Sequence, residues 1–425
     1  MGRLCEELAA RGMHGMKLGL SPMREACLSL GSPELSCPAV HIAGTNGKGA
    51  VAAILDAALG ARGLENVARY TSPHLVKIAE RFFIGGKRVD DEELESAAEE
   101  VFASEKTKAL TYFETLTAVA FVLFSRRKSP LAVLECGLGG RLDATNVCNS
   151  VLSVITKVGL DHCDWLGDTI EKISAEKSGI IRAGVPVVLG RNDRAVRAVV
   201  ESRAKEMGAP FFYAPDIADE SEIPSSFSLE GLFNRENALT AIAALKVLEK
   251  SGVIARADNL TAGFSDVVWP GRFHRIGGVI IDGAHNPPAA EALASSLFAL
   301  GLNKEKLVLV AGFCGDKDVE AVLQTLAPFV SRAVAVRTDN PRSLDANKTA
   351  SLMRQAGMEA LAASSLEEAL ILSGAREFSR EGGEAKPSVL ICGSLFLAGS
   401  ALCALGAMPY DSSAALEPAE RLRPL

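Results

Sequence analysis

The sequence lacks the features that mark secreted, membrane-bound and nucleic-acid-binding proteins. It has nine cysteines, an odd number, and none of them form a C-x-x-C pair, so we expect reduced thiols in the cytoplasm. Glu6 and Glu7 stand where a signal peptide would have its apolar core. The chain has no long basic run and a net charge of −7, so nucleic acid and anionic membranes are poor candidate partners. We expect a monomer that acts on small molecules.

One uncharged stretch, Pro387 to Tyr410, is long enough to span a bilayer. It contains glycines and serines, and the pattern that precedes it alternates between strands and helices. We therefore expect a buried strand over Val389 to Cys392, a turn at Gly393-Ser394 and a helix from Leu395. This interpretation predicts no membrane span.

A chain of 425 residues is too long for one ordinary domain, and its 48% hydrophobic and 23% charged content is normal for a globular protein. Short apolar runs alternate with helix-forming segments, which predicts an α/β fold with a mostly parallel sheet. The stretch Trp269 to Phe273 interrupts this pattern, and a fresh alternation follows it. We predict a P-loop-type domain over residues 1–273 and a smaller Rossmann-like domain over residues 276–425. The expected strands include Phe227 to Leu229 in the first domain, and Val279 to Asp282, Lys306 to Gly312, Ala333 to Arg337 and Val389 to Cys392 in the second.

The most informative stretch runs from Val40 to Ala50, where an apolar run enters a turn with three glycines around Lys48. A helix-forming segment follows, so backbone N–H groups, a helix N-terminus and an ammonium converge, as in a phosphate-binding loop. The spacing differs from a Walker A loop, and Gly49 stands where that loop has Ser or Thr. A hydroxyl ligand for Mg²⁺ must therefore come from elsewhere. The alternative is a glycine-rich turn that binds nothing.

Two side chains can supply oxygen ligands beside this loop. Ser72 follows a predicted strand, and Glu135 follows the apolar run Leu131 to Leu134. Parallel strands end at one edge of their sheet, so both side chains should lie near the glycine turn. A carboxylate in this position is where P-loop enzymes hold Mg²⁺, although a solvated loop acid is the simpler reading of Glu135.

Several longer motifs follow one another in a recognisable order. They are HIAGTNGKG at 41–49, TSPHL at 71–75, ERFFIGG at 80–86, YFETLTAVAF at 112–121, ECGLGGRLDATN at 135–146, GLDHCDWLGDTIEKISAEKSGII at 159–181, WPGR at 269–272, DGAHNPPA at 282–289, GFCGDKD at 312–318 and GSLFLAG at 393–399. In these motifs the chain resembles the folylpolyglutamate synthase and dihydrofolate synthase family of the Mur ligase superfamily. The resemblance covers roughly residues 15 to 405.

The resemblance implies an ATP-dependent ligase of folate biosynthesis and one-carbon metabolism. ATP would phosphorylate a pterin carboxylate, and the amine of L-glutamate would attack the acyl phosphate to give an amide, ADP and phosphate. The negative charge in such a reaction requires cations around the γ-phosphate, and the acyl phosphate requires protection from water. The first domain would then hold ATP and the pterin, and the second would be the glutamate-ligase domain.

Individual roles carry over from the family to matching positions. Predicted catalytic residues are Lys48, His162, Lys177 and Arg272. Predicted nucleotide contacts are Gly44, Thr45, Asn46, Gly47, Lys48, Gly49, Asn237, Arg272, Asp282 and His285. Predicted substrate contacts are Phe113, Asp143, Ala144, Thr145 and Ser394, and predicted ligands of two Mg²⁺ ions are Ser72, Glu135 and His162. Lys177 resembles the carbamylated lysine of the family.

The chain departs from the family pattern at two places, where Ala50 replaces a serine and Phe233-Asn234 replaces a His-Gln pair.

Two other functions are alternatives. A cell-wall ligase of the same superfamily usually carries an additional N-terminal domain, and a glycine turn at residue 44 is expected to leave no room for one. A non-catalytic nucleotide-binding protein is expected to lose the lysine and metal positions, whereas Lys48, Glu135, His162 and Lys177 are all present. The sequence does not choose between dihydrofolate synthase, folylpolyglutamate synthase and both.

Overall fold

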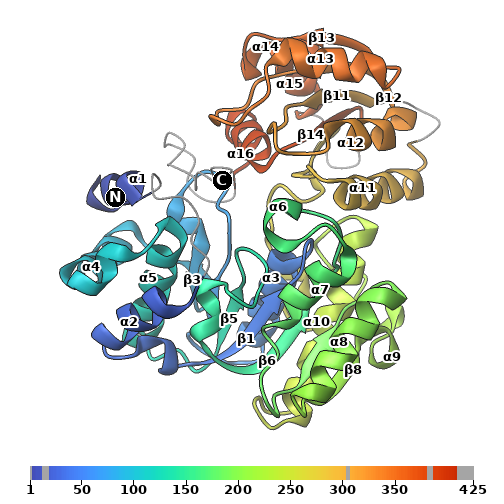
Figure 1. Ribbon diagram of the computed structural model, residues 1–425. Helices are drawn as coiled ribbons and strands as arrows, with labels where there is room; N and C mark the ends of the chain where they lie inside the picture. The colour runs from blue at the N-terminus through green and yellow to red at the C-terminus, as the bar shows by residue number, and fades with distance from the viewer. Residues whose placement is uncertain (1, 12–18, 303–306, 381–385, 409–425) are drawn as a thin grey trace. The chain divides into compact units, whose positions relative to one another are not determined.

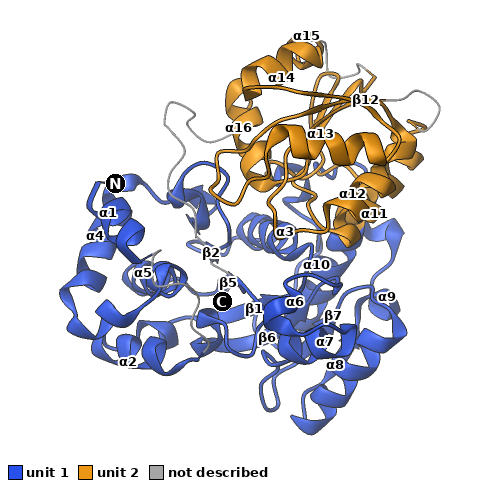
Figure 2. Cartoon of the chain, turned by 45° about the horizontal axis from the view of Figure 1, so that its top comes forward, with its two compact units in different colours: residues 1–228, 236–267, 417–425 blue, residues 229–235, 268–416 orange. Residues whose placement is uncertain are grey.

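A computed structural model describes residues 2–11, 19–302, 307–380 and 386–408 of the chain (Figure 1). The described residues form two compact units, coloured separately in Figure 2. The first contains residues up to 228 together with 236–267, and the second contains 229–235 together with 268–408. The predicted boundary motif, residues 269–273, thus lies within the second unit.

The first unit is built on an eight-stranded sheet in the order β4-β3-β2-β5-β1-β6-β7-β8. The strands are β1 (Pro38–Ala43), β2 (Ala68–Tyr70), β3 (Phe82–Ile84), β4 (Lys87–Arg88), β5 (Ala132–Glu135), β6 (Asn149–Ile155), β7 (Val187–Leu189) and β8 (Phe211–Tyr213). In this order the neighbours from β2 to β8 are parallel, and only β3 runs in the opposite direction, antiparallel to both β2 and β4. The predicted mostly parallel sheet is confirmed.

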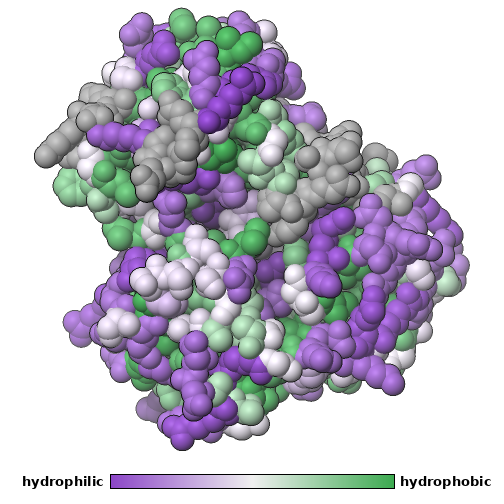
Figure 3. Space-filling model, turned by 180° about the vertical axis from the view of Figure 1, so that it is seen from behind, coloured by the Kyte–Doolittle hydropathy of each residue, from purple (hydrophilic) through white to green (hydrophobic). Residues whose placement is uncertain are grey.

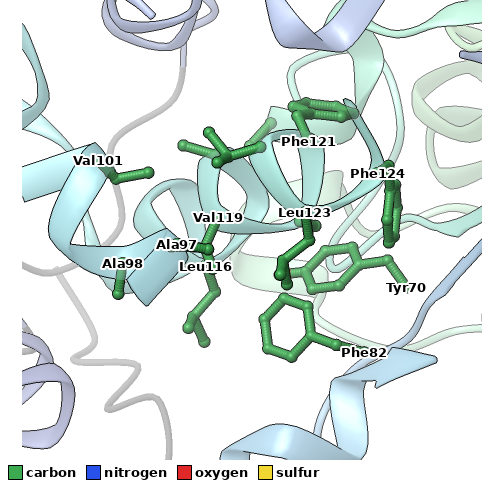
Figure 4. Packing of buried hydrophobic residues seen from close by; sticks show 14 of the residues in the cluster. Tyr70, Phe82, Ala97, Ala98, Val101, Leu116, Val119, Phe121, Leu123 and Phe124 are labelled. Carbon is green, nitrogen blue, oxygen red and sulfur yellow. The ribbon is translucent and has the colours of Figure 1, made fainter. Parts of the chain in front are cut away.

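Helices cover both faces of this sheet (Figure 1). They are α1 (Gly2–Arg11), α2 (Ser21–Ser29), α3 (Lys48–Ala61), α4 (Asp91–Ala103), α5 (Tyr112–Arg126), α6 (Cys163–Leu166), α7 (Ile170–Ser178), α8 (Arg194–Glu206), α9 (Ala214–Ile217) and α10 (Leu232–Lys250), of which residues from 236 on belong to this unit. The apolar helix α5 is buried along most of its length. Its Leu116, Val119 and Leu123 lie between α4 and the rings of Tyr70 and Phe82 (Figure 4).

The order of the strands determines where the predicted site forms. Strand β1 lies between β5 and β6, and all three run in the same direction. The loops that leave their carboxyl ends, residues 44–47, 136–143 and 156–162, therefore meet at one edge of the sheet. Ligands of open α/β sheets bind at such an edge, where the chain turns to opposite sides of a central strand.

The second unit has a six-stranded sheet in the order β13-β12-β11-β14-β10-β9, parallel except for the pair β10–β9. Its strands are β9 (His274–Ile276), β10 (Val279–Ile281), β11 (Leu307–Ala311), β12 (Val330–Ala335), β13 (Glu359–Ala362) and β14 (Val389–Cys392). Its helices are α11 (Pro287–Ala299), α12 (Val319–Leu326), α13 (Ala346–Gln355), α14 (Leu366–Leu372), α15 (Ala375–Phe378) and α16 (Leu395–Ala404). The predicted second α/β unit is confirmed.

Three details of the prediction were wrong or incomplete. Phe227 to Leu229 is not a strand, because Ser228 bonds to the carbonyls of Phe264 and Val267 in an irregular segment, and Phe227 packs on the Phe264 ring. Strands β9 and β13 were not expected. Both lie at an edge of their sheet and carry exposed or half-buried side chains, so they lack the apolar run of a central strand. The first residue of the predicted strand at 306–312 lies outside the described residues.

The uncharged stretch near the end of the chain folds as expected. Strand β14 and helix α16 occupy it up to residue 404, while its last two residues lie outside the described part. Among the helices that the structure describes, none is both long and apolar enough to cross a membrane. In Figure 3, hydrophilic side chains are spread over the visible face and smaller hydrophobic patches lie between them. All nine cysteines are described, and none is in a disulfide.

Candidate active site

The glycine turn after β1 has the tight geometry of an anion-binding loop. Gly44 and Gly47 have φ angles of 153° and 88°, and Gly47 caps the N-terminus of α3. A Cβ on Gly44 would lie 1.9 Å from Thr156 Oγ1, and a Cβ on Gly47 would lie 2.3 Å from Asn237 Oδ1. Only glycine fits at either position, because the space and the backbone conformation both exclude a side chain. The N–H groups of Thr45 and Asn46 donate to the Lys157 carbonyl, which ties the turn to the end of β6.

Lys48 begins α3 and bends back over the turn. Its Nζ donates to the carbonyls of Gly44 and Thr45 at 3.1 and 3.2 Å, and it lies 4.0 Å from Glu135 Oε1. The side chain is 15% exposed. An ammonium held beside a helix N-terminus in this way can bind a phosphate oxygen without first being reoriented.

The structure brings two predicted metal ligands together and leaves the third unassigned. Glu135 ends β5, and its Oε2 accepts a hydrogen bond from the Ser72 N–H at 3.0 Å. His162 caps the short α6 in a left-handed conformation, and its Nε2 lies 3.8 Å from Asp161 Oδ2. In the described part of the chain, no three His, Cys, Asp or Glu residues are grouped closely enough to hold a metal. A cation at Glu135 would therefore depend on Ser72, water and phosphate oxygens, which is the usual coordination of Mg²⁺ in nucleotide sites.

Lys177 is buried next to the same turn. It lies on α7, and its Nζ donates to the Gly44 carbonyl at 2.8 Å, so Lys48 and Lys177 share one acceptor. Burial, and after it the like charge of Lys48, lower the pKa of Lys177 from 10.5 to about 7. A substantial fraction of this side chain is therefore a neutral amine at neutral pH.

The predicted pterin residues form one cluster beside this loop edge. A Cβ on Gly137 would lie 2.6 Å from the Phe113 ring, so Phe113 packs directly against the loop that follows β5. In that loop, Asp143 accepts from the N–H groups of Leu138 and Thr145 at 2.9 and 3.0 Å, and also from the Thr145 hydroxyl. Ala144 and Thr145 are buried in the short 3₁₀ turn Ala144–Val147. Phe113 also belongs to the hydrophobic core, so it has a packing role besides its predicted contact with the substrate.

The predicted residues of the second unit gather at the carboxyl ends of β10 and β14. Asp282 Oδ2 and Oδ1 accept from the N–H groups of Phe273 and Ala284, both at 2.7 Å. Arg272 Nη1 donates to the Gly271 carbonyl at 3.0 Å, and His285 Nδ1 lies 2.7 Å from the Gly283 carbonyl. Ser394 Oγ caps α16 by accepting from the Leu397 N–H. Asp282 and Ser394 thus have clear structural roles, and their predicted ligand contacts remain predictions.

The two departures from the family pattern have simple local consequences. Ala50 is buried in the first turn of α3, where its methyl group adds to the core. Phe233 packs edge-on against Phe273 with ring centroids 6.2 Å apart, and Asn234 Nδ2 donates to the Glu230 carbonyl at 2.7 Å. At the positions of the His-Gln pair, Phe233 therefore makes an aromatic contact and Asn234 makes a local hydrogen bond to the backbone.

Comparison with known proteins places this arrangement in a family. Residues 271–395 match the glutamate ligase domain of Mur ligases. A dihydrofolate synthase/folylpolyglutamate synthase of Bacillus subtilis is 33% identical over 359 residues, which cover 77% of this chain and 83% of the relative. The chain belongs to the dihydrofolate synthase/folylpolyglutamate synthase family. It is thus an ATP-dependent ligase of folate metabolism.

Solved structures in this family agree over nearly the whole chain. A Mycobacterium tuberculosis folylpolyglutamate synthase complexed with ADP has a TM-score of 0.83 and 30% identity, and the match covers 96% of this chain and 99% of that one. A bifunctional folylpolyglutamate synthase/dihydrofolate synthase of Yersinia pestis, complexed with AMPPNP and a Mn ion, has a TM-score of 0.78 and 29% identity, covering 92% and 94% of the two chains. Both of these relatives are thus complexed with an adenine nucleotide, and the second also holds a divalent metal ion.

Sequence reasoning missed several residues that hold the site of this family member together. Thr156 donates to the Asn46 carbonyl at 2.7 Å, and the Thr45 hydroxyl and Gly159 backbone bond to each other in both directions. From the sequence, the buried His41 has no predicted role of its own beyond its place in the motif at 41–49. Its position inside an apolar strand could have indicated such a role, because a buried polar ring needs a hydrogen-bond partner.

Proposed function

We propose that this chain joins L-glutamate to a pterin carboxylate at the edge of the first sheet, through an acyl phosphate. Lys48 and the backbone N–H groups at the start of α3 would hold the β- and γ-phosphates of ATP, since the Thr45 and Asn46 N–H groups of the predicted 44–49 set already donate to the Lys157 carbonyl. The observation that carries the proposal is the position of Lys48 Nζ, 3.1 Å from the carbonyl of the glycine turn and 4.0 Å from the Glu135 carboxylate. An ammonium and a carboxylate thus lie close together at a helix N-terminus, and this supports a site for phosphoryl transfer, which needs positive charge around the phosphates and an oxygen ligand for a metal.

The residues present fit both ATP and Mg²⁺. The absence of space for a Cβ at Gly44 and Gly47 keeps the turn compact, so an anion can approach the N-terminus of α3 closely. Glu135 and Ser72 would hold the metal, which would neutralise charge on the transferred phosphoryl group. Two further parts of the site stay predictions from the sequence. They are the second Mg²⁺ at His162 and the nucleotide contacts of Asn237, Arg272, Asp282 and His285.

We also propose that Lys177 is carbamylated. Its neutral amine would attack CO₂, forming an N–C bond and releasing one proton, so that an ammonium becomes a carboxylate-like group. Burial and the neighbouring Lys48 favour the neutral amine that this step needs. The product would face Lys48 with an opposite charge, and it could accept from water molecules bound to the metal.

The first test is substrate-dependent phosphate release by the purified full-length chain. With ATP, Mg²⁺ and L-glutamate, we expect release with dihydropteroate, with tetrahydrofolate, or with both. Parallel assays identify the activity, and mass spectrometry should show a product heavier by one glutamate residue. A reaction that proceeds with neither pterin would contradict the proposed function. A reaction that requires a nucleotide-linked muramic acid would favour the cell-wall ligase.

The metal assignment predicts a shifted Mg²⁺ requirement in Glu135→Gln. Loss of the carboxylate charge should raise the Mg²⁺ concentration for half-maximal rate by roughly tenfold or more. Glu100→Gln is the matched control, because Glu100 forms an exposed pair with Arg126 on α4 and α5. An unchanged Mg²⁺ dependence in Glu135→Gln would remove Glu135 from the metal site.

A further inference from the structure

His41 lies in the middle of β1, three residues before the glycine turn, and is completely buried. Side chains alternate along a strand, so His41 shares a sheet face with Ala39 and Ala43. The loop that follows β5 crosses this face. Within it, Thr145 Oγ1 lies 2.8 Å from His41 Nε2, and Cys136 Sγ lies 3.1 Å from the same nitrogen. The phosphate-loop strand and the predicted pterin loop are therefore joined through one imidazole nitrogen.

The hydrogen bonds around this nitrogen have a definite direction. A hydroxyl carries one proton, and Thr145 gives its proton to Asp143 Oδ1. With Asp143 as a carboxylate, the Thr145 oxygen accepts from His41, so the proton of the ring is on Nε2. Burial, and after it the charge of Arg182, lower the pKa of His41 to about 3, which keeps the ring neutral. His41 Nδ1 is buried and has no hydrogen-bond partner, as expected for the unprotonated nitrogen of this tautomer.

We propose that His41 is a positioning residue for the pterin site, acting through the relay His41 Nε2–H to Thr145 hydroxyl to Asp143 carboxylate. The relay fixes the Thr145 rotamer, and the hydroxyl then holds one carboxylate oxygen of Asp143. The other oxygen of Asp143 is held by the Leu138 N–H. His41 thus sets the orientation of the predicted substrate contacts Asp143 and Thr145 without touching the substrate itself. The inference rests on the proposed function for the identity of the ligand.

The remaining ties of this loop do not replace the relay. Arg182 bonds to the Asn146 backbone and side chain, and Asn146 Nδ2 reaches the carbonyls of Arg141 and Gly179. These contacts, together with the hydrogen bonds of Arg141 to Glu176, hold Arg141 and Asn146 against α7 and the region after it. None of them reaches the Asp143 carboxylate, which is held by the backbone N–H groups of Gly137, Leu138 and Thr145 and by the Thr145 hydroxyl that bonds His41. Loss of the His41 donor should therefore loosen the Leu138 and Thr145 amides more than Arg141 and Asn146.

The alternative is that His41 only fills space in the core. Its orphan nitrogen argues against this, because an apolar side chain would fill the same space without leaving a buried polar atom unsatisfied. If His41 only packed in the core, the KM for the pterin would not depend on whether the side chain that replaces it can donate a hydrogen bond. This difference can be measured.

The first experiment needs no ligand, so it remains informative even if the proposed function fails. Amide hydrogen exchange is followed in the full chain at Leu138 and Thr145, whose N–H groups donate to Asp143. His41→Leu should speed exchange at both amides by roughly tenfold, because loss of the donor frees the hydroxyl. Ser153→Ala is the matched control. Ser153 on β6 is paired in register with His41 and is equally buried, and its hydroxyl donates to the Ile180 carbonyl.

The second experiment separates positioning from packing by kinetics. In His41→Leu, the KM for the pterin should rise roughly tenfold, while nucleotide affinity stays within about twofold of the wild type. His41→Gln should restore the wild-type KM, because a glutamine N–H reaches as far as imidazole Nε2–H. The shorter His41→Asn should not. On a Thr145→Val background, His41→Leu should add nothing, since the acceptor is already gone.

Each outcome supports or overturns the relay. Equal exchange rates at Leu138 and Thr145 in His41→Leu and Ser153→Ala would overturn it, as would equal pterin KM values for His41→Gln and His41→Asn. The Gln–Asn comparison stands even if the leucine variant does not fold. If His41→Leu shows the expected faster exchange but the wild type shows no pterin-dependent turnover, the proposed function fails and the relay remains a clamp on the Leu138 and Thr145 amides.

Discussion

Lys48→Ala is expected to reduce pterin-dependent phosphate release by roughly 10³-fold or more while the protein stays folded. The Lys48 ammonium is held over the glycine turn by two carbonyls and faces Glu135, so it is already in place for a phosphate before the substrate binds. Alanine removes this charge where negative charge develops during phosphoryl transfer. The Lys48 side chain is partly exposed and its hydrogen bonds go to two loop carbonyls, so its loss should cost little stability.

The matched control is Lys157→Ala. The backbone carbonyl of Lys157 binds the same turn, but its side chain is half-exposed and pairs with Asp193 at 3.5 Å on the surface. This variant should keep turnover within about twofold, because exposed pairs contribute little. Initial rates of phosphate release and thermal unfolding of both variants decide the matter. Near-normal turnover in Lys48→Ala would contradict the proposal that Lys48 binds the phosphates of ATP. A large loss of turnover in Lys157→Ala would show that the loss in Lys48→Ala is not specific to Lys48.

The fold could be read from the sequence where strands are central and apolar. Strands β1, β5, β6 and β14 are buried runs bounded by glycine or polar residues, and a parallel sheet needs such runs. The edge strands β9 and β13 were not predicted, because several of their side chains face solvent and their composition does not distinguish them from a loop. Phe227 to Leu229 shows the converse error. An apolar triplet can pack on another segment through one ring without pairing as a strand.

The sequence predicted the residues of the site only where a motif identified them. The sequence placed Lys48, Ser72 and Glu135 at one edge, and the structure brings these three together. It could not show that Lys177 shares an acceptor with Lys48, because they are far apart in the chain and meet only through the sheet. The roles of Asp282 and Ser394 in holding their own loops were equally hidden. A carboxylate or hydroxyl in a motif can serve the backbone, the ligand, or both.

Lys177→Ala is expected to reduce turnover by roughly 10²-fold, and a short carboxylate such as acetate or propionate should restore part of it. If Lys177 carries a carbamate, the alanine variant lacks an acceptor near the metal, and a small carboxylate can fill the same space. If Lys177 instead acts as an ammonium, carboxylates should not rescue the variant and Lys177→Arg should retain activity. Lys172→Ala is the control, because Lys172 lies on the same helix, is exposed and pairs with Asp168.

The pH dependence gives a second, independent readout of Lys177. Its pKa of about 7 means that the neutral amine becomes the main form as the pH rises through 7, whereas an exposed lysine would need a pH near 10.5. With ¹³C-labelled bicarbonate, a carbamate signal should therefore grow between pH 6 and about pH 8 in the wild type and in Lys172→Ala. The signal should be absent in Lys177→Ala. A wild-type protein that turns over fully but gives no carbamate signal would show that the buried amine, and not its CO₂ adduct, works beside Lys48.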